Sequence, residues 1–454
     1  MTAASTSGAL ERPIARVQNA SPHLLMPMTL LFALLVIAVL RSPDLVTNAG
    51  LGSAVIVAAP LILATYALMS TVVAGRGTVD LAIGPLISFI NVTLIQLVAA
   101  GVLESPVVTF AYAILVGMAY QLLMALIVIY VRVQPIIVSL SGYLALSGIN
   151  LVILPRPGGV APDWMSSWGL GTSVFSPVMA IVILATAAWL LMTRTAFFTH
   201  LRLMGSDERA AYTSGIPISI VRVGAHLIAG TFAGLSAICF TALIGSGDPG
   251  QGTTYTLIAV TALVLGGASL GGGRASIAGS LIGAVDLYLI TYVLSTFNFG
   301  GIQSFVTDLC YGAILVASLL LTLTLPIIQR RIGNFSSLLY FVALSVFTLG
   351  VILHSTFPYG DLPASTHAHM RGFLEANVLD GASAVSAGHS RAWATIGVLL
   401  VVLPLMVRSL VSGANRRGIG LVVYLVIAGF ALLCAYLMTR GYDLNVFTPG
   451  GASR

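Results

Sequence analysis

Runs of 17 to 26 mostly apolar residues recur between residues 24 and 439, and they constrain the fold of this chain more than any other feature. The hydrocarbon core of a bilayer is about 30 Å thick, and an α-helix needs about 20 apolar residues to cross it. Because backbone amides and carbonyls in lipid must be satisfied within the segment, such runs fold as helices. With 7% charged residues, the chain also lies far outside the composition of soluble domains. The sequence therefore predicts an all-α polytopic membrane protein.

The positions of the runs divide the chain into three parts. A polar tail is predicted over residues 1–22, a core of about ten transmembrane helices over 23–328, and about three additional helices over 329–454, with a polar loop at 354–391. The core helices are predicted at 24–40, 53–74, 81–103, 107–131, 135–154, 174–193, 219–243, 255–271, 276–296 and 303–328.

Arginine supplies every basic residue of the chain, since the sequence contains no lysine. This absence excludes a P-loop and Schiff-base catalysis, because both need a lysine amine. The net charge of +6 is spread over many loops, which argues against nucleic-acid binding. With the N-terminus inside and thirteen crossings, fourteen of the 20 arginines fall on the cytoplasmic side, as the positive-inside rule requires.

The sequence contains no recognisable catalytic or metal-binding set. H-E-x-x-H and C-x-x-C are absent, and the cysteines lie singly in apolar runs. The stretch from Gly245 to Gly250 matches G-x-G-x-x-G, but it follows a membrane helix rather than a strand, and we interpret it as a periplasmic turn. His367 and His369 lack further ligands at a zinc-site spacing, so a solvated loop is favoured over a metal site. We expect no catalytic site, metal or cofactor in this chain.

The most charged stretch of the core is the segment 194–218, which is predicted to be cytoplasmic. It favours a short helix, with Ser206 as N-cap, that ends at Gly215 and Pro217. Such a helix, held between two membrane spans, is suited to docking a soluble partner.

Several polar residues interrupt the apolar runs, and intramembrane ionisable residues are functional-site hypotheses by default. Neutral amides suit a neutral, hydroxyl-rich solute, although each polar group could equally join neighbouring helices. The candidates for a gate or pathway are Asp80, Gly84, Asn91, Gln121, Asn150, Asp286 and Asp308. For Asp80 we favour helix N-capping over gating, and Arg76 could pair with it or simply follow the positive-inside rule. The glycine-rich stretch 266–279 is either close helix packing or a turn along the pathway.

Three segments carry a resemblance to a known family. Gly205-Ser-Asp-Glu-Arg-Ala-Ala-Tyr-Thr-Ser-Gly-Ile216 is similar to the pattern G-x-N-x-x-A-A-x-x-S-G-I, with Asp207 at the position of the asparagine. The stretch 266–279 resembles G-G-T-S-L-x-G-G-x-G-S-x-x-G, and Thr78-Val-Asp-Leu-Ala-Ile-Gly-Pro85 resembles G-I-D-L-S-V-G-S. In this order and spacing, the segments resemble the ribose/xylose-type permeases of ABC importers, which are distantly related to branched-chain amino-acid permeases. The segment 329–454 departs from that family, whose members usually end after ten helices.

The resemblance implies a permease subunit in the bacterial inner membrane that translocates a sugar or similar small polar solute by alternating access. It also implies the partners, which are cytoplasmic ABC ATPase subunits, a periplasmic solute-binding protein, a second permease chain that is identical or homologous, and the lipid bilayer. ATP would be bound by the separate ATPase subunits. Pentoses, hexoses, polyols, nucleosides and signalling sugars all stay open as solutes.

Within this family pattern, the cytoplasmic segment is expected to couple the permease to the ATPase. Its residues would be Gly205, Asp207, Glu208, Arg209, Ala210, Ala211 and Gly215. Ala210 and Ala211 would form a small face for close approach, and Gly215 would reverse the chain. The alternative function is an ion-coupled secondary transporter, for which Asp286 and Asp308 would be the ionisable residues.

Overall fold

The computed structural model describes residues 24–316 apart from 104, 172, 298–304, 308 and 315. Within these residues every regular element is a helix, and the only strand-like pairing is an isolated bridge between Gly158 and Gly247. The predicted all-α class is thereby confirmed. The predicted tail 1–22, the additional segment 329–454 and the candidate Asp308 lie outside the described residues.

The helices follow the apolar runs closely. The longer ones are α2 (Leu25–Arg41), α3 (Asn48–Val73), α4 (Ile83–Ala99), α5 (Pro106–Leu126), α6 (Pro135–Ile153), α8 (Pro177–Met192), α11 (Ile218–Ile244), α12 (Tyr255–Leu265) and α13 (Ile277–Ser295). The shorter ones are α7 (Asp163–Ser166), α9 (Ala196–Ser206), α10 (Glu208–Thr213), a π-helical end of α5 (Ile127–Val131) and 3-10 turns at Pro43–Val46, Ser167–Leu170 and Gln251–Thr254.

Hydroxyl side chains set several helix starts. Thr47, Ser105, Ser176 and Ser276 each accept a hydrogen bond from an amide in the first turn of the helix that follows. These bonds satisfy amides that would otherwise lack a partner at the helix N-terminus.

Five helices of the described part are long and apolar enough to cross a membrane: α3, α5 with its π-helical end, α6, α11 and α13. The pair α8 and α9 meets the same test together but is bent by 77°. Two predicted spans are shorter than their apolar runs, because α4 has 17 residues and α12 has 11. Left-handed glycines follow the ends of both helices, Gly101 after α4 and Gly267 after α12.

The two longest helices form the centre of the bundle. From Ala58 to Val73 every residue of α3 is buried, and α11 packs along both α3 and α5. A Cβ atom added at Gly234 of α11 would lie 2.5 Å from the carbonyl oxygen of Ala113 on α5, and Gly230 is equally close to Gly117. In lipid, where packing replaces the hydrophobic drive, small residues four apart let two helix backbones approach this closely.

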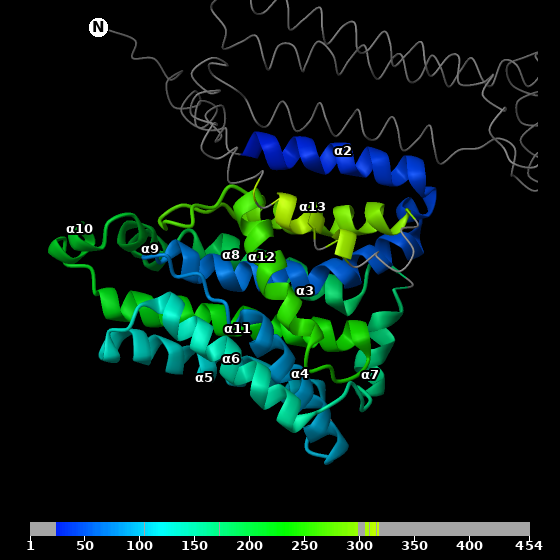
Figure 1. Cartoon of the computed structure of the whole chain (residues 1–454), viewed down its shortest axis with the longest axis horizontal. Helices are drawn as coiled ribbons and strands as arrows, with labels where there is room; N and C mark the ends of the chain where they lie inside the picture. The colour runs from blue at the N-terminus through cyan, green and yellow to red at the C-terminus, as the bar shows by residue number, and fades with distance from the viewer. Residues whose placement is uncertain are drawn as a thin grey trace, which may run out of the picture. The chain divides into compact units, whose positions relative to one another are not determined.

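Residues 26–34 and 44–323 belong to one compact unit, which includes helices α3 to α13. In this unit, α9 and α10 lie at the left end of the bundle in Figure 1, whereas α7 lies at the right end. By the predicted topology, the first end faces the cytoplasm and the second faces the periplasm.

Candidate functional site

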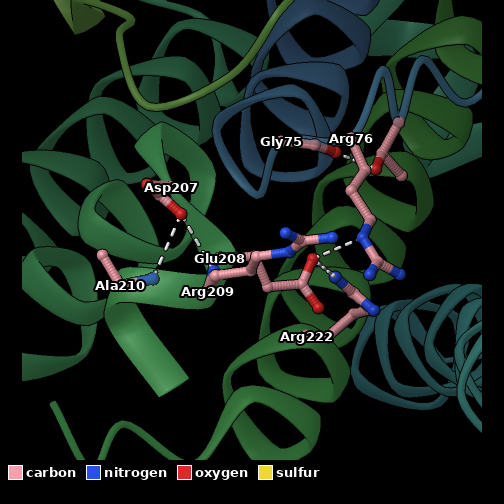
Figure 2. A network of polar contacts seen from close by, with 8 residues as sticks. Gly75, Arg76, Asp207, Glu208, Arg209, Ala210 and Arg222 are labelled. Carbon is pink, nitrogen blue, oxygen red and sulfur yellow. Dashed lines mark hydrogen bonds and ion pairs between the residues drawn. The ribbon is translucent and has the colours of Figure 1, made fainter. Parts of the chain in front are cut away.

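The segment between α8 and α11 folds into two short helices rather than the one predicted. Thr195 caps α9, which ends at Ser206, and α10 follows after Asp207 in extended conformation. The Asp207 carboxylate accepts hydrogen bonds from the backbone amides of Arg209 at 2.9 Å and Ala210 at 3.1 Å (Figure 2). The predicted N-cap, Ser206, is therefore wrong by one residue, because its hydroxyl bonds back to Arg202 within α9.

The end of α10 matches the expected chain reversal. Gly215 has a φ of +82°, and its amide donates to the carbonyl of Tyr212 at 3.0 Å. Only a residue without a Cβ adopts this left-handed backbone at no steric cost. After the turn, Ile216 is buried while Tyr212 is 73% exposed, so α10 is anchored on one side and open on the other.

Glu208 ties α10 to two other parts of the chain. Its Oε2 atom lies 2.5 Å from Nε of Arg76, in the α3–α4 connection, and 3.0 Å from Nη2 of Arg222 on α11 (Figure 2). The Arg222 side chain is 6% exposed, whereas that of Arg76 is 59% exposed. Since a buried arginine needs a partner, Glu208 is the charge that permits Arg222 at this position. Of the two alternatives that the sequence left open for Arg76, pairing with Asp80 is not formed, since Arg76 pairs with Glu208 instead.

Two of the motif segments, 205–216 and 266–279, meet the end of α3 beside this ion network. A Cβ atom added at Gly75 would lie 2.7 Å from Cα of Gly205, and one added at Gly272 would lie 2.7 Å from the carbonyl oxygen of Gly205. The amide of Gly273 also donates to the carbonyl of Val73 at 3.1 Å. The end of α3, the end of α9 and the glycine-rich stretch therefore pack backbone on backbone, which supports the close-packing interpretation of that stretch.

Asp80 belongs to a second polar cluster, inside the bundle. One of its carboxylate oxygens accepts from the Ala82 amide at 2.9 Å, and the other accepts from the side-chain amide of Gln121 on α5. The Gln121 oxygen lies 2.7 Å from Nδ1 of His226 on α11. Because an amide oxygen only accepts, Nδ1 carries the hydrogen and donates. All three side chains are almost completely buried.

The predicted N-cap role of Asp80 is wrong. Helix α4 starts at Ile83 with Ala82 as its N-cap, and no side chain caps it. Instead, the Asp80 carboxylate fixes the extended connection before the helix and binds α5.

The remaining predicted residues around α4 hold this helix to its neighbours. The amide of Gly84 donates to the Thr256 hydroxyl at 2.9 Å, and the Asn150 side chain donates to the carbonyl of Pro85 at 3.0 Å. These contacts fix the N-terminal turn of α4 against the start of α12 and against α6.

Asn91 makes three hydrogen bonds from the middle of α4. Its side-chain nitrogen donates to the Thr241 hydroxyl at 2.9 Å and to the carbonyl of Ser246 at 3.0 Å, and its oxygen accepts from the Asp248 amide at 2.8 Å. Asn91 is fully buried. It therefore joins α4 both to α11 and to the connection that follows α11.

Asp286 stands apart from both clusters. It lies on α13, it is fully buried, and neither carboxylate oxygen has a hydrogen-bond partner among the described residues. The structure brings Asp80 and Gln121 together, but it does not bring Asp286 to them. No group of three or more potential metal ligands occurs within the described residues.

The sequence analysis did not identify two candidate functional residues. Arg222 and His226 lie four residues apart, on one face of α11. A charged residue and a histidine at that spacing, near the start of an apolar run, were the available signal. Their partners, Glu208 on α10 and Gln121 on α5, lie 14 and 105 positions away and are brought close only by the fold.

The fold and this site define a multi-pass membrane protein with an anchored, charged helical segment at one end. The chain belongs to the family described as "branched-chain amino acid transport system / permease component", which matches residues 50–319. It is 29% identical over 264 residues to the ribose import permease protein RbsC of Escherichia coli (strain K12), covering 57% of this chain and 81% of the relative.

Two further relatives support the same family. The ribose import permease protein RbsC of Bacillus subtilis (strain 168) is 28% identical over 250 residues, covering 54% of this chain and 76% of the relative. The autoinducer 2 import system permease protein LsrD of Yersinia pestis (strain Pestoides F) is 26% identical over 283 residues, covering 60% and 81%. The predicted resemblance to ribose-type permeases is confirmed.

Proposed function

We propose that this chain is the membrane-spanning permease subunit of an ATP-driven ABC importer in the bacterial inner membrane. It would translocate a sugar or similar small polar solute, as the names of its relatives imply for them. The observation that carries the proposal is the α9–α10 segment, which is held firmly to the bundle and exposes one side. A permease that hydrolyses no ATP needs such an element to receive motion from its ATPase.

The residues of α10 divide into an anchored and an open set. Glu208 and Ala211 face the bundle, through two ion pairs and through burial respectively. Arg209, Ala210 and Tyr212 are exposed and would contact the ATPase. The predicted close-approach face of Ala210 and Ala211 is thus divided between the two sets, since only Ala210 is available to a partner.

The Asp207 cap gives α10 the stiffness that the proposed role needs. Isolated helices of this length are marginal in water, because nucleation fixes several residues for a single hydrogen bond. A capping carboxylate contributes about 1 kcal/mol and also favours the positive helix N-terminus. The α10 helix would therefore be folded before it contacts the ATPase.

The other partners follow from the same proposal. A periplasmic solute-binding protein would deliver the solute at the end opposite α10, and a second permease chain would complete the pathway. ATP would be bound by the ATPase subunits and not by this chain.

ATPase activity of the reconstituted complex tests the proposal. The triple variant Asp207→Ala, Glu208→Ala, Arg209→Ala is compared with the wild type and with Arg156→Ala, Asp163→Ala, which removes exposed charges near the other end. We expect an ATPase to co-purify with the wild type and the control, and co-purification to be lost in the triple variant. If no ATPase co-purifies with the wild type and uptake follows an ion gradient, the proposal fails and Asp286 becomes the residue to test.

A further inference from the structure

The α3–α4 connection is bound to the rest of the protein at two levels. Near its start, Arg76 pairs with Glu208 of α10, and near its end, Asp80 binds Gln121. The helix α11 supplies a partner at each level, Arg222 for Glu208 and His226 for Gln121. A displacement of α10 relative to α11 therefore acts directly on the Glu208 ion pairs, and through Arg76 on the connection that carries Asp80.

The connection leads directly into α4, which reaches toward the opposite end of the bundle. A helix of 17 residues is about 25 Å long and transmits a push without bending much. Halfway along, Asn91 holds the carbonyl of Ser246 and the amide of Asp248. The α4 helix therefore connects the two polar clusters physically with the α11–α12 connection.

The α11–α12 connection in turn closes onto the α6–α7 connection. Gly158 and Gly247 exchange two backbone hydrogen bonds of 3.0 and 2.9 Å, and the Ala161 amide donates to the carbonyl of Gly245 at 3.0 Å. Because all three bonds join the same two loops, a separation of the loops would break them together. The loops belong to the end predicted to face the periplasm.

We propose that the α3–α4 connection and α4 transmit motion from α10 to this loop pair, with Gln121 and Asn91 as positioning residues. The inference rests on the proposed function, since it takes α10 as the element that the ATPase moves. Helix α11 is the reference along which α4 shifts, because it reaches the connection before α4 indirectly, through His226 and Gln121 of α5, and the middle of α4 directly, through Thr241 and Asn91. Buried polar clusters of this kind have few satisfied arrangements, so a small displacement switches them between discrete states.

The test follows the accessibility of the loop pair while the ATPase is cycled. A reporter, Gln251→Cys, is placed on the exposed turn after Asp248, in a chain whose own three cysteines are changed to alanine. Its labelling rate by a membrane-impermeant maleimide is measured in the reconstituted complex, without nucleotide and with ATP plus vanadate. We expect trapping to change the rate about fivefold or more, which corresponds to a coupling of about 1 kcal/mol.

The decisive comparison uses Gln121→Met, which keeps the side-chain length but removes both hydrogen bonds. Both Gln121→Met and Asn91→Leu should lose more than about half of the coupling free energy of about 1 kcal/mol. In each variant, trapping should therefore change the labelling rate by less than about twofold. Thr109→Val is the matched control, because Thr109 is a buried α5 residue whose hydroxyl bonds only Ser105 of its own helix turn. The control should keep the full effect.

The outcomes separate this inference from the proposed function. If an ATPase co-purifies and is active, but trapping changes the labelling equally in the wild type and in Gln121→Met, the inference is overturned and the proposed function stands. A wild-type rate that does not respond to trapping overturns the inference as well. Unchanged thermal unfolding and gel filtration in Gln121→Met exclude misfolding as the cause of a lost response. If no ATPase co-purifies at all, the failure lies with the proposed function.

Discussion

The centre of the bundle and helix α10 are held in place by different forces. Where α3, α5 and α11 cross, apolar side chains and glycine backbones are in direct contact, with Ala113 and Gly234 among the closest pairs. Helix α10, whose first turn the Asp207 carboxylate caps, is held to the same bundle by the two ion pairs of Glu208. Close packing resists any change of shape, whereas polar contacts can exchange partners. We therefore call the packed centre of α3, α5 and α11 the frame, and α10 with the ion pairs of Glu208 the joint.

The largest effect is expected from a substitution in the frame. In Gly230→Leu, the new side chain would overlap the backbone of α5 at Gly117 and Met118. We expect destabilisation by about 3 kcal/mol or more, since overpacking cannot be relieved by a rotamer change. Thermal unfolding in detergent and the yield of monodisperse protein measure it, with the neighbouring Thr231→Val as control. Near-normal stability of Gly230→Leu would mean that the two regions do not differ as described.

A smaller effect is expected when the joint loses its central charge. Glu208→Ala leaves the buried Arg222 without a carboxylate, which costs about 1–3 kcal/mol, as for other unpaired buried polar groups. The double variant Glu208→Ala, Arg222→Met should recover most of that stability but not the ATPase stimulation. Thermal unfolding combined with ATPase assays distinguishes the two effects, and equal stability of the single and double variants would contradict the pairing.

Removal of the α10 cap should have a still smaller effect on stability. Asp207→Ala loses two hydrogen bonds to the helix N-terminus and should cost about 1 kcal/mol. Asp207→Asn keeps an oxygen that accepts and should behave like the wild type. Stimulated ATPase activity compares the three proteins, and an Asn variant as impaired as the Ala variant would show that charge rather than capping matters.

The smallest effect is expected at the exposed ion pair. Arg76→Gln should change stability by less than about 1 kcal/mol, because the Arg76 side chain is 59% exposed and solvent screens its charge. The difference from the wild type should shrink as sodium chloride is raised. Thermal unfolding across a salt series measures it, and a large difference that is insensitive to salt would place Arg76 in the frame instead.

The sequence predicted the parts of the fold that depend on local pattern. Most apolar runs became helices within a few residues of the expected bounds, and Gly215 made the expected turn. The N-cap of α10 was missed because Ser206 and Asp207 are adjacent and both can cap, and only the end of α9 decides between them.

The contacts between distant segments were beyond prediction. Asp80 was identified as a polar residue of interest, but its binding to Gln121 depends on how α5 packs beside the connection. The partners of Glu208 come from residues 132 positions before it and 14 positions after it. The functions of all these residues stay proposals.

Photocrosslinking from α10 in the assembled complex tests the central claim most directly. A photoactivatable thiol label is attached at Ala210→Cys, in a chain without its own cysteines, and compared with the same label at Val160→Cys in the α6–α7 connection. Both positions are exposed, and they lie at the predicted cytoplasmic and periplasmic ends respectively. The account predicts a crosslink to the ATPase subunit from position 210 and none from position 160. A complex with an active ATPase that gives no crosslink from position 210 would contradict it.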